Sequence, residues 1–447
     1  MVAAGEAVSA AVAASGERKA STDELAAAIA LAELPRMTPA RLRRLLVESR
    51  APDSWRELRA WPSSSNRRPA PDWFPSGAGG RHGQAELVEL WARTARRVEP
   101  AERLAAYRRS GTGAALWWQP LYPAVLGGDP SVSGLLFFRG ELPFGRPVPS
   151  VAVVGTRSAT PYGRDVAYEL GRALSEAGVV VVSGLSEGIT ACAQAGALAG
   201  EGMAPVVVAV GGVDVVGSTA LSPLWDRVAA RGAVVSEVPL SRRADKWRFP
   251  WRNRLVAALA DVVVVVESHR EGAALATAEA AARRDRPVLA VPGSVRSSAS
   301  RGSNALISDG CTPCLGPEDV LVALSLAGRQ QGGARRTGLL PAAPRCRDHA
   351  GFPLPVAPGG PVAPGGSAVT DGCSEEERAV LDGLDDAPAT LATVTARSGL
   401  AVGAAALALD RLVGRGLVSD GGGWWCRLPF APPPVCGTAE CTVGDLG

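Results

Sequence analysis

Six short apolar runs, separated by segments of helical periodicity, dominate the middle of the chain. They are rich in β-branched residues and do not alternate with polar residues, which is typical of strands buried on both faces of a parallel sheet. Helix start signals lie between them, such as Thr160 followed by a proline at the first helical position. The pattern predicts the fold class α/β, with a Rossmann-like, doubly wound and mostly parallel sheet over residues 113–326. The runs cover residues 151–154, 179–182, 206–210, 234–235, 262–266 and 288–291.

Residues 21–112 predict a helical N-terminal domain of the sterile-alpha-motif (SAM) or helix-hairpin type, after a disordered segment over residues 1–20. Apolar residues recur at helical spacing on both sides of a break at residues 35–39. The second helix could be half of a nucleic-acid-binding hairpin, although it lacks the Gly-x-Gly turn that exposes backbone amides to phosphate. The alternative is that it packs on its neighbours. The arginines in question are Arg41, Arg43 and Arg44.

The C-terminal part of the chain predicts a linker, a small domain and a tail. Residues 327–372 are rich in Gly and Pro, which indicates a flexible linker. A capping box of Ser374 and Glu377 then begins a helix, and two more helices and a short hairpin follow. This order predicts a winged helix over residues 373–430 and a tail over residues 431–447. A protein-contact module is the alternative, because the recognition-type helix has few polar side chains for base edges.

Charge is unevenly distributed along the chain. The 447 residues carry a formal net charge of +3, which by itself is no nucleic-acid signature. Residues 36–110, however, contain 16 Arg against 8 Asp and Glu. This local excess fits either a nucleic-acid contact or a solvated helical face.

Cysteine and histidine usage argues against a metal site. The chain has eight cysteines and three histidines, and nothing near the pair Cys311 and Cys314 supplies the second ligand cluster that zinc needs. We therefore expect no metal, no other cofactor and reduced thiols. The first 20 residues lack the basic start of a secretory signal, and the most apolar run is too short to span a bilayer. These features predict a cytoplasmic protein without membrane contact.

Small residues follow the predicted strands, at the sheet edge where open α/β sheets bind ligands. Glycine permits close approach of a ligand to the backbone, and arginine offers a forked cation for phosphate. None of the loops has the Gly-x-Gly-x-x-Gly spacing of a dinucleotide site or the Gly-Lys-Ser/Thr of a P-loop. The candidate phosphate-contacting residues in the first three loops are Gly155, Arg157, Ser183, Gly184, Gly188, Gly211 and Gly212.

A basic and aromatic segment over residues 249–254 precedes the fifth strand. Two arginines flank an amide there, with two aromatic residues interleaved, which suits phosphate pairing combined with base stacking. The alternative is that Arg254 caps a helix while the aromatic residues pack. The candidate nucleic-acid-binding residues in this segment and in two later polar loops are Phe249, Arg252, Asn253, Arg254, Gly293 and Asn304.

The order of these motifs resembles that of the DNA-processing protein A family (DprA or Smf), in a divergent, actinobacterial-like form. The ordered set spans about residues 120–315. Its members are Tyr122-Pro123, VGTR at 154–157, SGL and GI at 183–189, GGVD at 211–214, FPWRNR at 249–254, VVE at 265–267, GAALATA at 272–278, VPG at 291–293 and GSNALISDG at 302–310.

The resemblance implies a protein that binds and protects incoming single-stranded DNA and loads the RecA recombinase during natural transformation or recombination, without a catalytic step. It also implies a homodimer formed through the Rossmann-like domain. The residues that would contact DNA phosphates or shape the site are, by position, Arg157, Ser183, Gly184, Arg252 and Arg254.

The chain departs from the family pattern at positions that bear on DNA affinity. Thr190 and Gln194 stand where the family has an acid and a histidine, and Gly217 begins the segment that replaces a Tyr-Pro pair and a basic residue. Glu271 adds a negative charge near the predicted site. Loss of a cation beside phosphate is expected to weaken binding by about 1 kcal/mol or more. The departures therefore predict reduced or altered DNA affinity.

Two other functions stay open on sequence grounds: a nucleotide-binding sensor or scaffold, and a nucleotide hydrolase of the same broad fold. A hydrolase could use Glu187 and Glu267 as a carboxylate pair, but no histidine is placed beside them. The Pro-Gly-Gly-x-Gly-Thr loop of such hydrolases is also absent. We therefore predict that the protein is not an enzyme.

Overall fold

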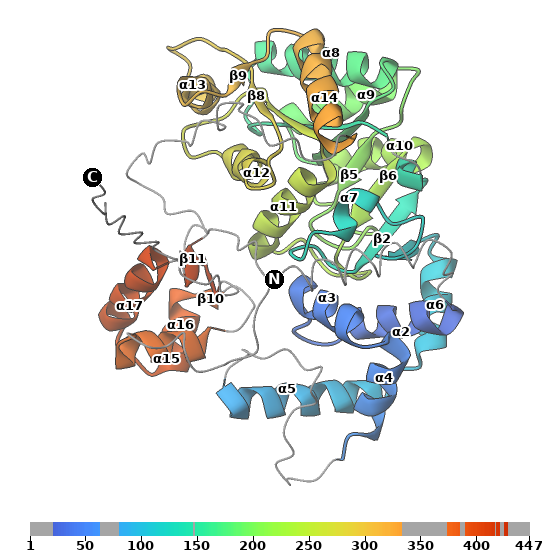
Figure 1. Cartoon of the computed structure of the whole chain (residues 1–447), viewed down its shortest axis with the longest axis vertical. Helices are drawn as coiled ribbons and strands as arrows, with labels where there is room; N and C mark the ends of the chain where they lie inside the picture. Colours follow the sequence, from blue (N-terminus) through green and yellow to red (C-terminus); the bar gives the residue numbers. More distant parts are fainter. Residues whose placement is uncertain are drawn as a thin grey trace, which may run out of the picture. The chain divides into compact units, whose positions relative to one another are not determined.

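The computed structural model describes residues 21–62, 80–145, 148–332, 373–384, 389–415, 417–420 and 424–427 (Figure 1). The predictions for residues 1–20, for the linker beyond residue 332 and for the tail lie outside the described residues. The described residues belong to two compact units, 21–332 and 373–427, which we treat separately. No described helix alone has the length and apolar composition of a membrane span, and the bent helix pair Leu391–Ser398 and Val402–Val413 meets these two criteria only when taken together.

A nine-stranded sheet forms the centre of the larger unit, in the order β1-β2-β6-β5-β4-β3-β7-β8-β9. Strands β3 to β9 pair in parallel, whereas β1 and β2 form an antiparallel edge that joins β6. The predicted α/β fold with a mostly parallel sheet is therefore confirmed. The strands are β1 Gly113–Leu116, β2 Leu135–Gly140, β3 Ser150–Val154, β4 Val180–Gly184, β5 Val206–Val208, β6 Ala233–Ser236, β7 Val262–Val265, β8 Val288–Ala290 and β9 Thr312–Pro313.

The six apolar runs of the sequence correspond to β3 to β8. The sequence does not predict strands β1, β2 and β9, because their own residues show little strand preference. Strand β1 reads GAAL and β2 reads LLFFRG, so neither contains a β-branched residue, and β9 has only two residues. Their positions are fixed by pairing with the sheet and not by local preference.

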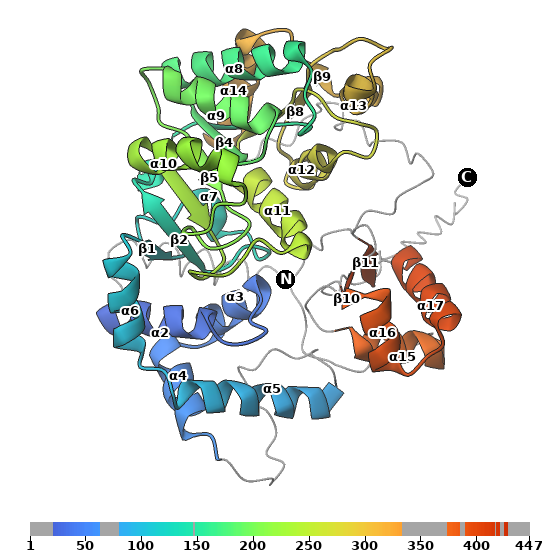
Figure 2. The same cartoon turned by 180° about the vertical axis from the view of Figure 1, so that it is seen from behind.

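Helices cover both faces of this sheet and share its core. On one face, α8, α9 and α14 bury their apolar residues against β3, β4 and β7. On the other face, α11 and α12 lie side by side and pack against β3 to β7 (Figures 1 and 2). The helices that follow the strands are α7 Ala124–Gly127, α8 Pro161–Glu176, α9 Ile189–Ala199, α10 Ser222–Arg231, α11 Phe249–Leu259, α12 Ala273–Ala282, α13 Arg301–Ser308 and α14 Pro317–Gly332.

The chain changes direction in the sheet between β3 and β7. Strands β4, β5 and β6 extend from β3 toward one edge, while β7, β8 and β9 extend toward the other. In open α/β sheets such a switch point opens a crevice at the carboxyl ends of the strands. The loops after β3, β4 and β7 therefore border the place where a ligand is expected.

The N-terminal helices pack into the same unit as the sheet. Figure 2 shows them gathered beside β1 and β2, and their buried residues form one hydrophobic cluster with Leu135, Phe137 and Val207 of the sheet. The predicted break lies between α2 and α3. The helices are α2 Thr22–Ala32, α3 Pro39–Glu48, α4 Ala51–Ala60, α5 Gly80–Ala95 and α6 Pro100–Arg109.

The arginines of α3 serve packing more than ligand contact. Arg41 and Arg43 are only 2% and 7% exposed. Arg43 donates to the Gly127 carbonyl at 2.5 Å and lies over the Trp117 ring at 5.0 Å. Arg44 forms an exposed ion pair with Glu48 on the same helix. Packing therefore accounts for Arg41 and Arg43, and the helix-hairpin assignment of this domain stays a prediction.

The smaller unit contains three helices and a three-stranded antiparallel sheet in the order β10-β12-β11. The predicted capping box of Ser374 and Glu377 is present. The element order is the one expected of a winged helix, an assignment that stays a prediction. Helix α14 of the larger unit continues past the expected linker start at residue 327. The elements are α15 Glu375–Gly383, β10 Ala389–Thr390, α16 Leu391–Ser398, α17 Val402–Gly414, β11 Val418–Asp420 and β12 Trp424–Arg427.

Candidate nucleic-acid interface

The loop after β3 is held at the switch point by backbone hydrogen bonds from both sides. The Thr156 amide donates to the Glu267 carbonyl at 2.8 Å, and the Ile189 amide donates to the Thr156 carbonyl at 3.2 Å. These bonds tie together the loops after β3, β4 and β7. They leave the side chain of Arg157 exposed at the rim.

Arg157 and Arg252 converge on one aromatic ring. The guanidinium carbon of each lies 5.6 Å from the centre of the Phe249 ring. Neither guanidinium makes a hydrogen bond or an ion pair to any residue that the structure describes, and the Nε of Arg252 is buried without a partner. Two neighbouring cations without a carboxylate are costly unless an anion offsets them. This pair is therefore the strongest candidate for a phosphate contact.

The electrostatics of Arg252 reflect its surroundings. Burial, and secondly the positive charge of Arg157, lower the pKa of Arg252 to about 10. Because this pKa is still well above 7, the side chain stays cationic at neutral pH. A bound phosphate would favour the charged form and raise the pKa again.

Two glycines make room for this pair. A Cβ at Gly184 would lie 0.9 Å from the Nη1 of Arg252, so any side chain there would displace the guanidinium. Gly188 has a φ of +81°, and a Cβ there would lie 2.3 Å from the Arg157 carbonyl oxygen. Both glycines thus shape the phosphate site without offering a side chain.

Arg254 and Asn253 are committed to the fold. Arg254 forms an ion pair with Glu237, whose side chain is only 5% exposed, and also donates to the Ser131 carbonyl. Asn253 is buried and donates to the Ala273 carbonyl at 3.2 Å. These internal partners tie both side chains to the fold, while the Nε of Arg254 is buried without a partner. Direct contact of either residue with nucleic acid stays a prediction.

The remaining predicted residues shape loops. Gly211 packs against the Arg242 carbonyl, and Gly212 donates to it at 2.9 Å. Asn304 exchanges two hydrogen bonds of 3.0 Å with the backbone of Gly293. Gly211 and Gly212 follow β5 and Gly293 follows β8, so these loops lie at the same edge of the sheet, and their contact with nucleic acid stays a prediction.

The carboxylate of Glu267 occupies the start of α8 at the switch point. It accepts a hydrogen bond of 2.9 Å from the Thr160 amide and one of 2.6 Å from the Thr160 hydroxyl. A Cβ at Gly163 would strike the same carboxylate. A nucleotide phosphate binds at this position in dinucleotide-binding folds. Glu267 thus places a fixed anion where such a phosphate would otherwise lie.

Trp247 and Arg248, which the sequence did not single out, lie just before α11 in a short 3₁₀ turn, Lys246–Arg248. The Trp247 ring lies 4.9 Å from that of Trp251, and the guanidinium of Arg248 lies 4.7 Å from the Trp247 ring centre. The signal was available, because a lysine, a tryptophan and an arginine directly precede Phe249. The basic and aromatic segment should have been extended backward to residue 246.

Metal-ligating side chains do not gather among the residues that the structure describes, where no group of three or more could hold an ion. Cys311 and Cys314 are both free thiols. Burial, and secondly the charge of Asp319, raise the pKa of Cys314 to about 12. These thiols do not form part of the candidate interface.

Comparison with known proteins places the larger unit in a family. The family model for "DNA recombination-mediator protein A" matches residues 114–325. The DNA processing protein DprA of Bacillus subtilis is 32% identical over 217 residues, covering 48% of this chain and 73% of that protein. The chain belongs to the DNA recombination-mediator protein A family. The resemblance seen in the order of sequence motifs is thereby confirmed.

Other members of the DNA recombination-mediator protein A family extend the comparison. The putative DNA processing protein DprA of Mycobacterium tuberculosis is 41% identical over 189 residues. The alignment covers 42% of this chain and about half, 48%, of that relative. The X-ray structure of DprA from Streptococcus pneumoniae matches with a TM-score of 0.51 at 23% identity, covering 68% of this chain and 98% of that chain, and supports the fold.

Two departures from the DNA recombination-mediator protein A motifs have internal partners. Gln194 donates to the buried Ser183 hydroxyl at 2.8 Å and to the Val206 carbonyl at 3.2 Å. Thr190 donates to the Ser186 carbonyl at 2.8 Å and accepts from the Ser186 amide. Ser183 itself donates to the Gly184 carbonyl at 2.7 Å, so it supports the loop and does not face a ligand. Gln194 thus contacts the end of β4 beside Gly184, whose lack of a side chain leaves room for Arg252.

Proposed function

We propose that this chain is a cytoplasmic recombination mediator that binds and protects single-stranded DNA and loads RecA onto it. The observation that carries the proposal is the pair of guanidinium groups, Arg157 and Arg252, that meet over Phe249 without an acidic partner. Family membership supports the same role. We propose no catalytic step.

A single strand fits this pair better than a duplex does. Arg157 is exposed at the rim, whereas the Nε of Arg252 is buried. Because Arg252 is half-buried as a whole, a phosphate that contacts both cations must approach the loops closely. The flexible backbone of a single strand can bend a phosphate inward, while its bases remain free to stack on aromatic side chains.

The position of Glu267 argues against the nucleotide-sensor and hydrolase alternatives. Glu267 is 1% exposed, and its carboxylate accepts two hydrogen bonds from Thr160. A general base must reach the proton that it removes, and a nucleotide phosphate would have to displace this anion from the start of α8. Both requirements conflict with the observed geometry.

Loading of RecA is tested with single-stranded DNA coated by single-stranded-DNA-binding protein. Addition of the wild-type protein should stimulate the DNA-dependent ATPase activity of RecA on this substrate. The Arg157→Ala variant should give little stimulation, because it cannot hold the strand. Equal ATPase rates with and without the wild-type protein would contradict the loading role while leaving DNA binding itself untouched.

We further propose that two copies associate through α14. Leu315, Val322 and Leu326 are 82%, 59% and 57% exposed, and the last two lie one helical turn apart on one face. Exposed apolar side chains grouped in this way are typical of an interaction surface.

The double variant Leu315→Glu/Leu326→Glu should therefore shift the mass measured by light scattering. The wild type is expected at twice the chain mass of 45.8 kDa and the variant at the chain mass. Leu121→Glu, at a residue 41% exposed elsewhere, is the matched control and should stay dimeric. A wild type with the mass of one chain, or a variant that remains dimeric, would refute this surface.

A further inference from the structure

The segment between β6 and α11 forms a basic loop, residues 239–248, at the carboxyl edge of the sheet. It leads directly into α11, the helix that carries Arg252. The loop holds four cations and one acid, so its own charge is positive. The cations are Arg242, Arg243, Lys246 and Arg248, and the acid is Asp245.

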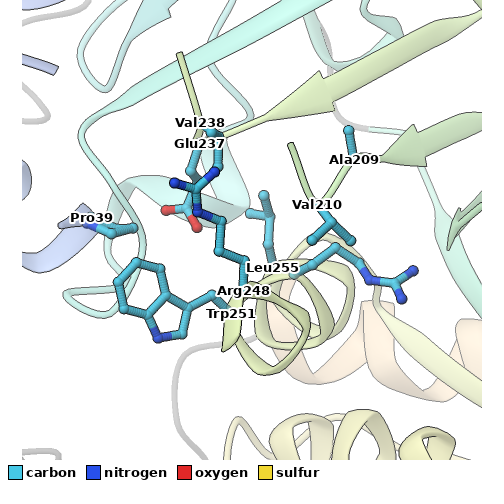
Figure 3. A pocket seen from close by; sticks show the side chains of 9 residues that line it. Pro39, Ala209, Val210, Glu237, Val238, Arg248, Trp251 and Leu255 are labelled. Atoms are coloured by element: carbon cyan, nitrogen blue, oxygen red, sulfur yellow. The ribbon is translucent and has the colours of Figure 1, made fainter. Parts of the chain in front are cut away.

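The basic loop adjoins the proposed phosphate site. Arg248 and Arg252 both line a small hollow at the carboxyl ends of β5 and β6 (Figure 3). The volume of this hollow is about 20 Å³, enough for a single water molecule, so a DNA strand can meet these cations only at the surface. The Nη1 of Arg248 donates to the Arg243 carbonyl at 2.9 Å. The positive charge of the cation pair therefore continues into the basic loop.

The guanidinium groups at the start of the basic loop lie close to Arg248 and face solvent. Burial lowers the pKa of Arg248, Asp245 opposes this shift, and the charge of Arg242 lowers the pKa further. Arg242 and Arg243 are both exposed. The guanidinium of Arg243 makes no hydrogen bond or ion pair within the part of the chain that the structure describes. These two side chains are therefore available to an anion.

The loop after β5 fixes the backbone of the basic loop from one side. Ser241 has a φ of +62°, in the left-handed region that favours glycine. Both carboxylate oxygens of Asp214 accept from the Ser241 amide at 2.9 Å, and one also accepts from its hydroxyl at 3.1 Å. The Gly212 amide donates to the Arg242 carbonyl at 2.9 Å. These contacts hold Ser241 in a conformation that it would otherwise rarely adopt.

The N-terminal helices hold the basic loop from the other side, through Tyr107 of α6. Its hydroxyl accepts from the Leu240 amide at 3.1 Å and donates to Glu33 at 3.0 Å. Arg103 donates two hydrogen bonds of 2.6 Å to the same carboxylate. Tyr107 is 1% exposed, and its ring centre lies 5.2 Å from that of Phe137 in β2. The hydroxyl that binds the basic loop is therefore fixed in position.

The protonation state of Tyr107 suits this role. Burial, and secondly the charge of Glu33, raise the pKa of Tyr107 far above its usual value. The hydroxyl therefore keeps its proton at neutral pH and can donate to Glu33 while it accepts from Leu240. Arg242 adds a second link, because it donates to the Glu33 carbonyl at 3.2 Å.

We propose that Arg242 and Arg243 contact further phosphates of the bound strand, and that Tyr107 is a positioning residue that holds the basic loop for this contact. The inference rests on the proposed binding of single-stranded DNA and extends it beyond the cation pair. Tyr107 itself does not touch DNA. The N-terminal helices thus act on DNA affinity through the basic loop.

A double-mutant cycle tests this inference, with oligo-dT binding measured by fluorescence anisotropy at several salt concentrations. Arg242→Ala/Arg243→Ala should weaken binding roughly 10-fold or more, since hydrogen bonds to charged groups are lost. Its salt slope should be shallower by about 1.4, or about 0.7 for each lost phosphate contact. Tyr107→Phe should weaken binding by roughly 2- to 10-fold, the effect of one neutral hydrogen bond. In the Arg242→Ala/Arg243→Ala background, Tyr107→Phe should have no further effect.

Tyr122→Phe is the matched control. It removes another buried phenol hydroxyl, which donates to the Ser133 carbonyl and not to the basic loop. This variant should bind oligo-dT as the wild type does. Tyr107→Phe keeps the ring and its contact with Phe137, and urea unfolding should show that it remains folded.

The outcomes separate this inference from the proposed function. If Tyr107→Phe binds as the wild type does, or weakens binding equally with and without the two arginines, the positioning role is refuted. If Arg242→Ala/Arg243→Ala binds normally while Arg157→Ala binds weakly, the basic loop is refuted and the cation pair stands. If the wild type does not bind oligo-dT, the proposed function and this inference both fail.

Discussion

Replacement of Arg252 by alanine should weaken binding of an oligo-dT by roughly 10- to 150-fold, while the protein remains folded. A hydrogen bond to a charged group contributes about 1.5–3 kcal/mol, and Arg252 is positioned to donate such a bond to phosphate. Stability should not fall with affinity, because this guanidinium has no hydrogen bond or ion pair with the described residues. Removal of a partly desolvated cation beside Arg157 instead relieves repulsion.

Two variants make this prediction specific. Arg252→Lys keeps the charge but loses the planar fork, so it should recover only part of the affinity. Arg172→Ala removes an arginine from an exposed ion pair with Glu176 on α8 and should bind as the wild type does. If Arg252→Ala bound oligo-dT with unchanged affinity, the cation pair would not be the DNA site.

The Arg254→Ala variant should lose stability by about 3–5 kcal/mol, which is the usual cost of leaving one partner of a buried ion pair alone. The carboxylate left behind is that of Glu237, which is 5% exposed and also accepts a hydrogen bond from the Ser133 amide. Urea unfolding followed by circular dichroism measures the loss.

The Glu237→Gln substitution isolates the effect of the buried negative charge of Glu237 on stability. It keeps the shape of the side chain and an acceptor for Ser133 while removing the buried negative charge, so Arg254→Ala/Glu237→Gln should be more stable than Arg254→Ala. Arg172→Ala, which breaks an exposed pair, should change stability by about 1 kcal/mol or less. A midpoint for Arg254→Ala equal to that of the wild type would show that the pair does not hold the structure together.

The parallel strands could be predicted from the sequence, because strands buried on both faces consist of continuous apolar, β-branched runs. Valine-rich runs such as 262–266 admit few other interpretations once polar alternation is absent. Strand β1 contains no such run of β-branched residues. Its four residues GAAL form a strand because all four pair with β2, which itself joins the sheet through β6.

The candidate site was predicted by position but not by role. The order of the loops was enough to place Arg157 and Arg252 at one edge of the sheet. It could not reveal that Arg254, two residues further on, points to Glu237 and to Ser131, which is 123 residues away in the chain. Long-range partners of this kind decide whether an arginine is available to a ligand, and no local pattern encodes them.

The role of Glu267 also depends on a long-range contact that no local sequence pattern encodes. As a carboxylate directly after a strand it suggested a general base, yet in the folded chain it accepts hydrogen bonds at the start of α8. Gly184 shows the reverse case. Its conformational freedom was predicted, but its function is to leave space for the guanidinium of Arg252, a residue that lies far along the chain.

Binding of oligo-dT and of a duplex of equal length, measured by mobility shift for the wild type and Arg157→Ala at several salt concentrations, tests the central claim most directly. We predict that the wild type prefers oligo-dT and that its affinity falls as salt rises. Arg157→Ala should bind more weakly, and its salt dependence should be shallower by about 0.7, the slope expected for one lost phosphate contact with a single strand. Equal affinity for the two forms of DNA, or an Arg157→Ala variant that binds as well as the wild type, would contradict the account.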